Sequence, residues 1–172
     1  MNISYKLSKK VYFIILIISL IWCSLIILTP VLASLQGFPE SVSTVLYIFF
    51  SNVCHQIDDR SYHILGHALG VCSRCSFIYF AFLIGVILYP FIHKLDNVRM
   101  PAIWVIITAA VLMVGDALLD IFDLFNNTFI TRSITGFILG VVLPFYLIPG
   151  FTIFSYEIQS YFKYKNQTSD IK

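Results

Sequence analysis

Four long stretches of the chain are almost entirely apolar, and they set the expected architecture. They cover residues 11–33, 75–92, 101–119 and 133–156, and Asp116 is the one charged residue within them. A helix rises about 1.5 Å per residue, so about 20 apolar residues cross a hydrocarbon core about 30 Å thick. The pattern therefore predicts four transmembrane helices.

The first and the fourth stretch each carry a feature that modifies this picture. Val31-Leu32-Ala33 has the form of a signal-peptide cleavage site. The apolar core of such a leader is about 7–15 residues, shorter than this stretch, so we expect a retained helix. Pro144 and Pro149 lie inside the fourth stretch and predict a kink there.

The connection over residues 34–74 is long and contains a shorter amphipathic piece. Gly37-Phe38-Pro39 indicates a turn followed by a helix start. Apolar residues then recur at helical spacing at Val42, Val45, Leu46, Phe49 and Val53. We expect a helix that lies at the membrane interface; a fifth, short span is the alternative.

Composition agrees with a membrane protein of one domain, residues 1–172. Hydrophobic residues make up 59% and charged residues 12%, against about 45–50% and about 25% in soluble domains. The expected fold is an all-α bundle of four transmembrane helices in contact with the lipid bilayer. The net charge of +2, without a basic stripe, argues against nucleic acid as a partner.

The distribution of basic residues predicts the orientation. If the helices alternate, eight of the eleven basic residues share one side of the membrane. These eight are Lys6, Lys9, Lys10, Lys94, Arg99, Lys163, Lys165 and Lys172. The positive-inside rule then places both termini in the cytoplasm of a multi-pass cell-membrane protein, and the connection over residues 34–74 outside.

Cysteine and histidine residues cluster in that outer connection. Zinc prefers four Cys or His ligands in a tetrahedron, and a C-x₂-C pair can aim two thiolates at one ion. Cys54, His67, Cys72 and Cys75 would supply a Cys₃His set. His55 and His63 are alternates; a helix would put His63 and His67 on one face. Cys23, inside the first apolar stretch, is expected to be a packed thiol.

Other chemistries compete for the same residues. Cys72 and Cys75 could form a redox-active dithiol with Cys54 as the resolving thiol. This arrangement resembles four-helix membrane oxidoreductases that pass electrons from disulfides to quinone, although those usually carry a second cysteine pair. A plain structural disulfide is the third interpretation. Haem attachment would need His after the C-x₂-C pair, and Ser76 stands there.

Acidic residues near the outer end of the third helix lie at the same level of the membrane. Asp116 and Asp120 are four residues apart and share one helix face, and Arg132 begins the fourth helix. A carboxylate in a membrane segment normally faces a partner or a water-filled cavity. These three residues are candidates for a catalytic role beside the metal, or they form a clamp between two helices. Gly136 and Gly140 form G-x-x-x-G, which favours packing within the chain and, second, a homo-oligomer.

Several of these motifs together resemble the domain of unknown function 2085 (DUF2085) family, small prokaryotic membrane proteins without an established activity. The first motif consists of Cys54-His55-Gln56, Arg60-Ser61, Gly66-His67, Val71-Cys72, Arg74-Cys75 and Ile78-Tyr79. The second consists of Asp116 and Arg132-x-x-Thr135-Gly136-x-x-x-Gly140. Phe77, Ala117 and Asp120 depart from the family pattern, so the resemblance does not carry over an acid pair.

The leading hypothesis is a metal site, with zinc as the expected cofactor, on the outer side of the membrane. An open coordination position would let zinc-bound water act as a nucleophile, whereas a closed site would be structural. A quinone-linked thiol oxidoreductase and a non-catalytic subunit of a membrane complex are the alternatives. The sequence indicates no substrate or reaction, and so leaves open whether the protein is an enzyme.

Overall fold

The computed structural model describes residues 5–35, 37–95, 97–122 and 128–169. Its helices are α1 (Tyr5–Ala33), α2 (Phe38–Ser51), α3 (Ser73–Ile92), α4 (Ile103–Ile121), α5 (Phe129–Val142) and α6 (Pro144–Ser169). A short 3₁₀ helix, η1 (Asp58–Arg60), and a hairpin of β1 (His63–Ile64) and β2 (His67–Ala68) lie between α2 and α3.

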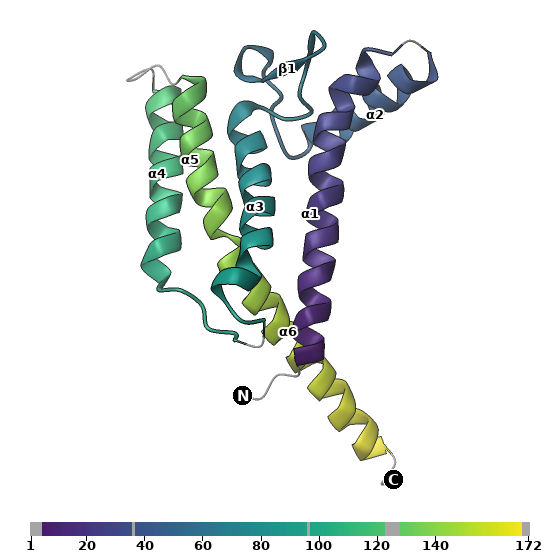
Figure 1. The fold of residues 1–172 in the computed structure, drawn as a ribbon, viewed down its shortest axis with the longest axis vertical. Helices are drawn as coiled ribbons and strands as arrows, with labels where there is room; N and C mark the ends of the chain where they lie inside the picture. The colour runs from purple at the N-terminus through teal and green to yellow at the C-terminus, as the bar shows by residue number, and fades with distance from the viewer. Residues whose placement is uncertain (1–4, 36, 96, 123–127, 170–172) are drawn as a thin grey trace.

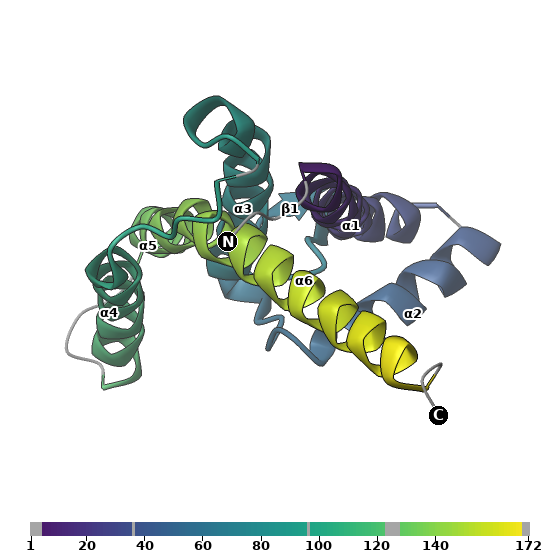
Figure 2. The same ribbon diagram turned by 90° about the horizontal axis from the view of Figure 1, so that it is seen from below.

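The structure confirms the predicted all-α membrane bundle. Four helical segments are long and apolar enough to cross a membrane: α1, α3, α4 and the combined α5–α6 segment. The fourth is broken at Leu143, directly before Pro144, in agreement with the expected kink. Figure 1 shows α4, α5, α3 and α1 side by side, with α6 continuing obliquely below them. Seen from below, α6 crosses toward the α1 side of the bundle (Figure 2).

One end of the bundle collects the polar features. At this end α1 and α4 finish, α3 and α5 begin, and the hairpin lies above α3 (Figure 1). We refer to it as the cysteine end. The first residue of α1 and the last turns of α6 lie at the opposite end, as expected for an even number of spans.

Helices α3 and α5 form the most extensive pair in the bundle, and glycines allow their close approach. A Cβ atom on Gly136 would lie 2.6 Å from the carbonyl oxygen of Arg74, and one on Gly140 would collide with the carbonyl of Ile78. The G-x-x-x-G motif therefore packs within the chain, as its first interpretation held. This contact fixes the start of α5 against the start of α3.

Helix α2 folds back on α1 and closes the cysteine end from one side. Ser43 donates a hydrogen bond to the carbonyl of Thr29 over 2.7 Å, and Phe50 is fully buried beside Trp22. The opposite face exposes Val45 and Ile48. Exposed apolar side chains on this face are consistent with the interfacial placement expected for this helix.

Candidate metal centre and arginine cavity

Three of the four cysteines meet at the cysteine end. Cys54 follows α2, Cys72 caps α3, and Cys75 lies in its first turn. Their sulfur atoms all lie within 4.8 Å of one another. Zn–S bonds of about 2.3 Å in a tetrahedron place sulfurs about 3.8 Å apart, so only a small contraction would be needed. All four cysteines are free thiols in this structure.

The Cys54 sulfur accepts hydrogen bonds from several neighbouring groups. It accepts backbone N–H bonds from Cys72 (3.2 Å) and from Gln56 (3.5 Å). Hydrogen bonds from the Cys72 and Cys75 thiols hold the pKa of Cys54 far below its ordinary value, the backbone bonds add to this, and desolvation opposes it. A metal ion bound here would take the place of the protons that the three thiols share.

The chain around Cys54 is shaped by Gln56, which the sequence showed only as part of the family motif, without a role. Gln56 has a positive φ of 49°, and its side-chain amide donates to the carbonyls of Tyr47 (2.9 Å) and Gly70 (2.7 Å). It thereby joins the end of α2 to the segment that enters α3. This connection holds Cys54 against Cys72 although the two are far apart in sequence.

The histidines of this connection do not join the close group that the three sulfur atoms form. The group of closely spaced ligand atoms among the described residues contains no imidazole. His67 is exposed on β2, and His63 on β1 lies 3.1 Å from Asp58. The two occupy a hairpin, not a helix, because Leu65 and Gly66 both adopt positive φ at its turn. His55 lines the same cavity as the three cysteines.

That cavity, of about 200 Å³, is also lined by all three basic residues of the cysteine end. Arg60 and Arg132 both donate to Asp120, over 2.8 and 2.9 Å. Arg74 donates to Asp116 over 2.5 Å. The carboxylates therefore join η1, α3, α4 and α5 rather than α4 and α5 alone. We expected Arg132 as their partner; Arg60 and Arg74 were missed, although they are the only other basic residues on that side.

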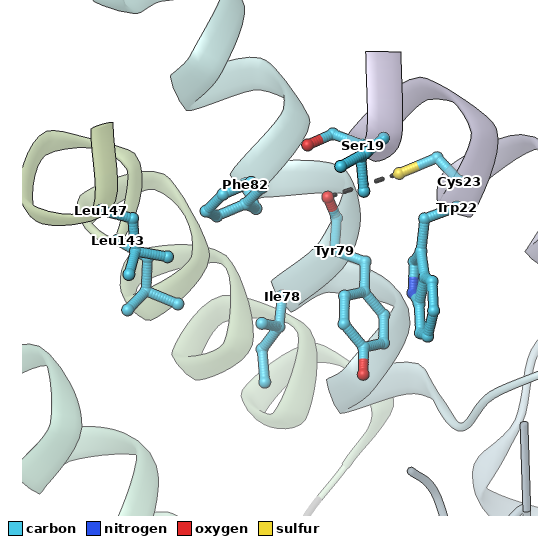
Figure 3. Close-up of a pocket in the computed structure, with 9 residues that line it drawn as sticks. Ser19, Trp22, Cys23, Ile78, Tyr79, Phe82, Leu143 and Leu147 are labelled. Atoms are coloured by element: carbon cyan, nitrogen blue, oxygen red, sulfur yellow. Dashed lines mark hydrogen bonds between the residues drawn. The ribbon is translucent and has the colours of Figure 1, made fainter. Parts of the chain in front are cut away.

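A second, apolar cavity of about 270 Å³ lies between α1, α3 and the junction of α5 and α6. Figure 3 shows Trp22 and Cys23 from α1, Tyr79 and Phe82 from α3, Leu143 between α5 and α6, and Leu147 in the first turn of α6. The Cys23 thiol donates to the Tyr79 carbonyl over 3.5 Å, consistent with the expected packed thiol. Tyr79 also packs against the cluster that contains Cys54, so the two cavities are close neighbours.

Comparison with known proteins assigns the chain to a family. The sequence model of a family described as predicted membrane protein (DUF2085) matches residues 54–146, more than half of the chain. The uncharacterized protein MJ1492 of Methanocaldococcus jannaschii is 41% identical over 146 residues, 83% of this chain and 94% of the relative. No solved structure matches. The matched range contains the three clustered cysteines and the three arginines, and the chain belongs to the DUF2085 family of membrane proteins.

Proposed function

We propose that this protein carries a metal centre at its cysteine end, held by the thiols of Cys54, Cys72 and Cys75, with zinc as the ion. The observation that supports it is the approach of three sulfurs to within 4.8 Å from two separate parts of the chain. Zinc favours thiolate ligands in a tetrahedron. The half-buried position of Cys72 and Cys75 also leaves a path for an ion to enter.

His55 is our candidate for the fourth ligand. It follows Cys54 directly and lines the same cavity as the three thiols, whereas His67, the ligand favoured from sequence, lies on the hairpin and is not among the lining residues. Both imidazoles are exposed. His67 and His63 remain alternates. Four protein ligands would make the centre structural; an open position would give a Lewis acid next to arginine side chains, with Asp116 and Asp120 behind them.

The metal content of the purified protein tests the proposal. We expect about one equivalent of zinc by elemental analysis, and thiolate-to-cobalt charge-transfer absorption after exchange with Co²⁺, as tight thiolate binding predicts. His55→Gln should shift the cobalt ligand-field bands, whereas His67→Gln should not. Less than about a tenth of an equivalent of any transition metal, after growth and purification with zinc present, would contradict the proposal.

We propose that the cysteine end faces outward and that the opposite end, with the basic residues, faces the cytoplasm. A membrane-impermeant thiol reagent applied to intact cells should then label Leu65→Cys on the hairpin turn but not Lys94→Cys. Both positions are exposed, which makes them a matched pair. Labelling of each variant is compared with that of the unmodified protein, whose partly accessible Cys72 and Cys75 supply the background. Labelling of the Lys94 variant above this background would refute the orientation.

A thiol oxidoreductase is a second candidate, and the apolar cavity favours it. A quinone in this cavity would lie near Tyr79, about one helical turn from Cys75. Two thiols would lose two electrons and two protons to form a disulfide, and the quinone would become a quinol. Mass spectrometry of the isolated protein distinguishes the candidates. A disulfide between clustered cysteines that reforms with added quinone supports it; thiols that stay reduced exclude it.

A further inference from the structure

Among the residues that the structure describes, the arginine cavity presents more hydrogen-bond donors than acceptors. The guanidinium of Arg132 is 9% exposed and gives one nitrogen to Asp120. Its Nε, like that of Arg74, is buried and has no hydrogen-bond partner. A buried charged donor without an acceptor is destabilising, so native proteins rarely leave one.

Guanidinium groups favour a particular class of ligand. Their planar forks bind oxyanions through two parallel bonds, one of which often comes from Nε. Arg60, Arg74 and Arg132 converge from η1, α3 and α5 on one cavity. Two carboxylates of the chain already bind part of these forks, on the α4 side. The N-terminus of α3, at Cys72, adds the positive end of a helix dipole to the same place.

The guanidinium N–H groups that have no acceptor favour anion binding here more than the net charge does. Among the described groups, the three guanidinium groups and the two carboxylates that pair with them leave one positive charge. A small oxyanion can bind there because hydrogen bonds from fixed, partly buried donors stabilise it. The volume of about 200 Å³ exceeds the about 30 Å³ occupied by one water molecule.

We propose that the cavity between Arg60, Arg74 and Arg132 binds a phosphate-type oxyanion, either a free ion or the phosphate of a lipid headgroup. The site goes beyond the metal centre and does not require it, since the two share a cavity but use different side chains. Its position at the ends of α3, α4 and α5 places it where lipid phosphates occur, while Arg60, 43% exposed, leaves it accessible.

Two probes distinguish the sources. Equilibrium binding of radiolabelled inorganic phosphate, with the protein in a neutral detergent, detects a free anion. Native mass spectrometry with phosphatidylglycerol against phosphatidylcholine detects a lipid phosphate. Each measurement is made before and after chelation, with the zinc content determined on the same samples. Failure of the metal proposal would thus appear in the zinc content and leave the anion result separate.

Three variants locate the site. Arg60→Gln removes the most exposed guanidinium while Arg132 still balances Asp120. Arg132→Lys keeps a charge beside Asp120 but lacks Nε and the planar fork. Arg99→Gln is the control, because Arg99 is exposed in the α3–α4 connection at the opposite end. We expect binding to weaken about 10- to 100-fold in the first two and to stay unchanged in the control.

Each possible result either supports the oxyanion site or overturns it. Saturable phosphate binding that follows this pattern supports a free-anion site. Binding of phosphatidylglycerol alone, lost in Arg60→Gln and Arg132→Lys, supports a headgroup site. Folded wild-type protein that binds neither probe would overturn the proposal and leave a water-filled cavity. Equal losses in Arg99→Gln would overturn it as well, because binding would then reflect general surface charge.

Discussion

Replacing Cys54 with serine is expected to abolish stoichiometric zinc binding and to lower zinc affinity by more than about 100-fold. Changes in groups that only orient metal ligands already cost about 10–100-fold, and a direct thiolate ligand contributes more. Cys54 is 6% exposed and packs beside Phe50 and Val71, so its position is fixed by the core. Competition with a chromophoric chelator measures the affinity, and elemental analysis measures the stoichiometry.

Cys23→Ser is the matched control for this experiment. Cys23 is 5% exposed, nearly the same as Cys54, and its thiol donates to a helix carbonyl instead of facing other thiols. Both variants put a hydroxyl in a buried position, so any common loss of stability cancels between them. Zinc content should stay at about one equivalent in Cys23→Ser. If both variants retained zinc equally, the three-thiol centre would be excluded.

The second large effect is expected for Asp120→Asn, which should destabilise the protein by about 3–5 kcal/mol. The Asp120 carboxylate is 9% exposed and accepts from both Arg60 and Arg132. Removing one partner of a buried pair leaves a buried charge uncompensated, which is the costly case. Because Arg60 is partly solvated, most of the loss should come from Arg132. Thermal and denaturant unfolding in detergent, followed by circular dichroism, measures it.

The control is Asp58→Asn, since Asp58 is 76% exposed in its pair with His63. Exposed pairs contribute about 1 kcal/mol or less, so this variant should unfold almost like the wild type. Adding Arg132→Gln to Asp120→Asn should restore part of the lost stability, because the uncompensated charge is then removed. Equal unfolding midpoints for Asp120→Asn and Asp58→Asn would show that the clamp does not stabilise the bundle.

The thiol cluster and the ion pairs of Asp120 are neighbours at the cysteine end. Cys72 and Arg74 belong to the same turn at the start of α3, and Gly136 on α5 packs directly against the Arg74 carbonyl. The contact between Gly136 and the Arg74 carbonyl therefore sets how the thiols at the start of α3 lie relative to Arg132 on α5. A metal centre and an anion site in one cavity would both depend on this packing.

The sequence by itself determined the four spans and the kink at Pro144, because membrane insertion depends on local properties: apolar length, charge and proline geometry. It also identified the grouping of Cys54 with Cys72 and Cys75, since few polar residues are available in a chain of this composition. The C-x₂-C spacing alone brings two of the thiols together.

Only the tertiary structure decided which partners meet across the bundle. Helical spacing suggested a shared face for His63 and His67, but positive φ at Leu65 and Gly66 turns that segment into a hairpin. Residue spacing likewise gave no sign that Arg60 reaches Asp120 from a different part of the chain. Such contacts depend on how α2 and α5 pack against α1 and α3, and packing arises from shape complementarity among distant residues, which no local pattern encodes.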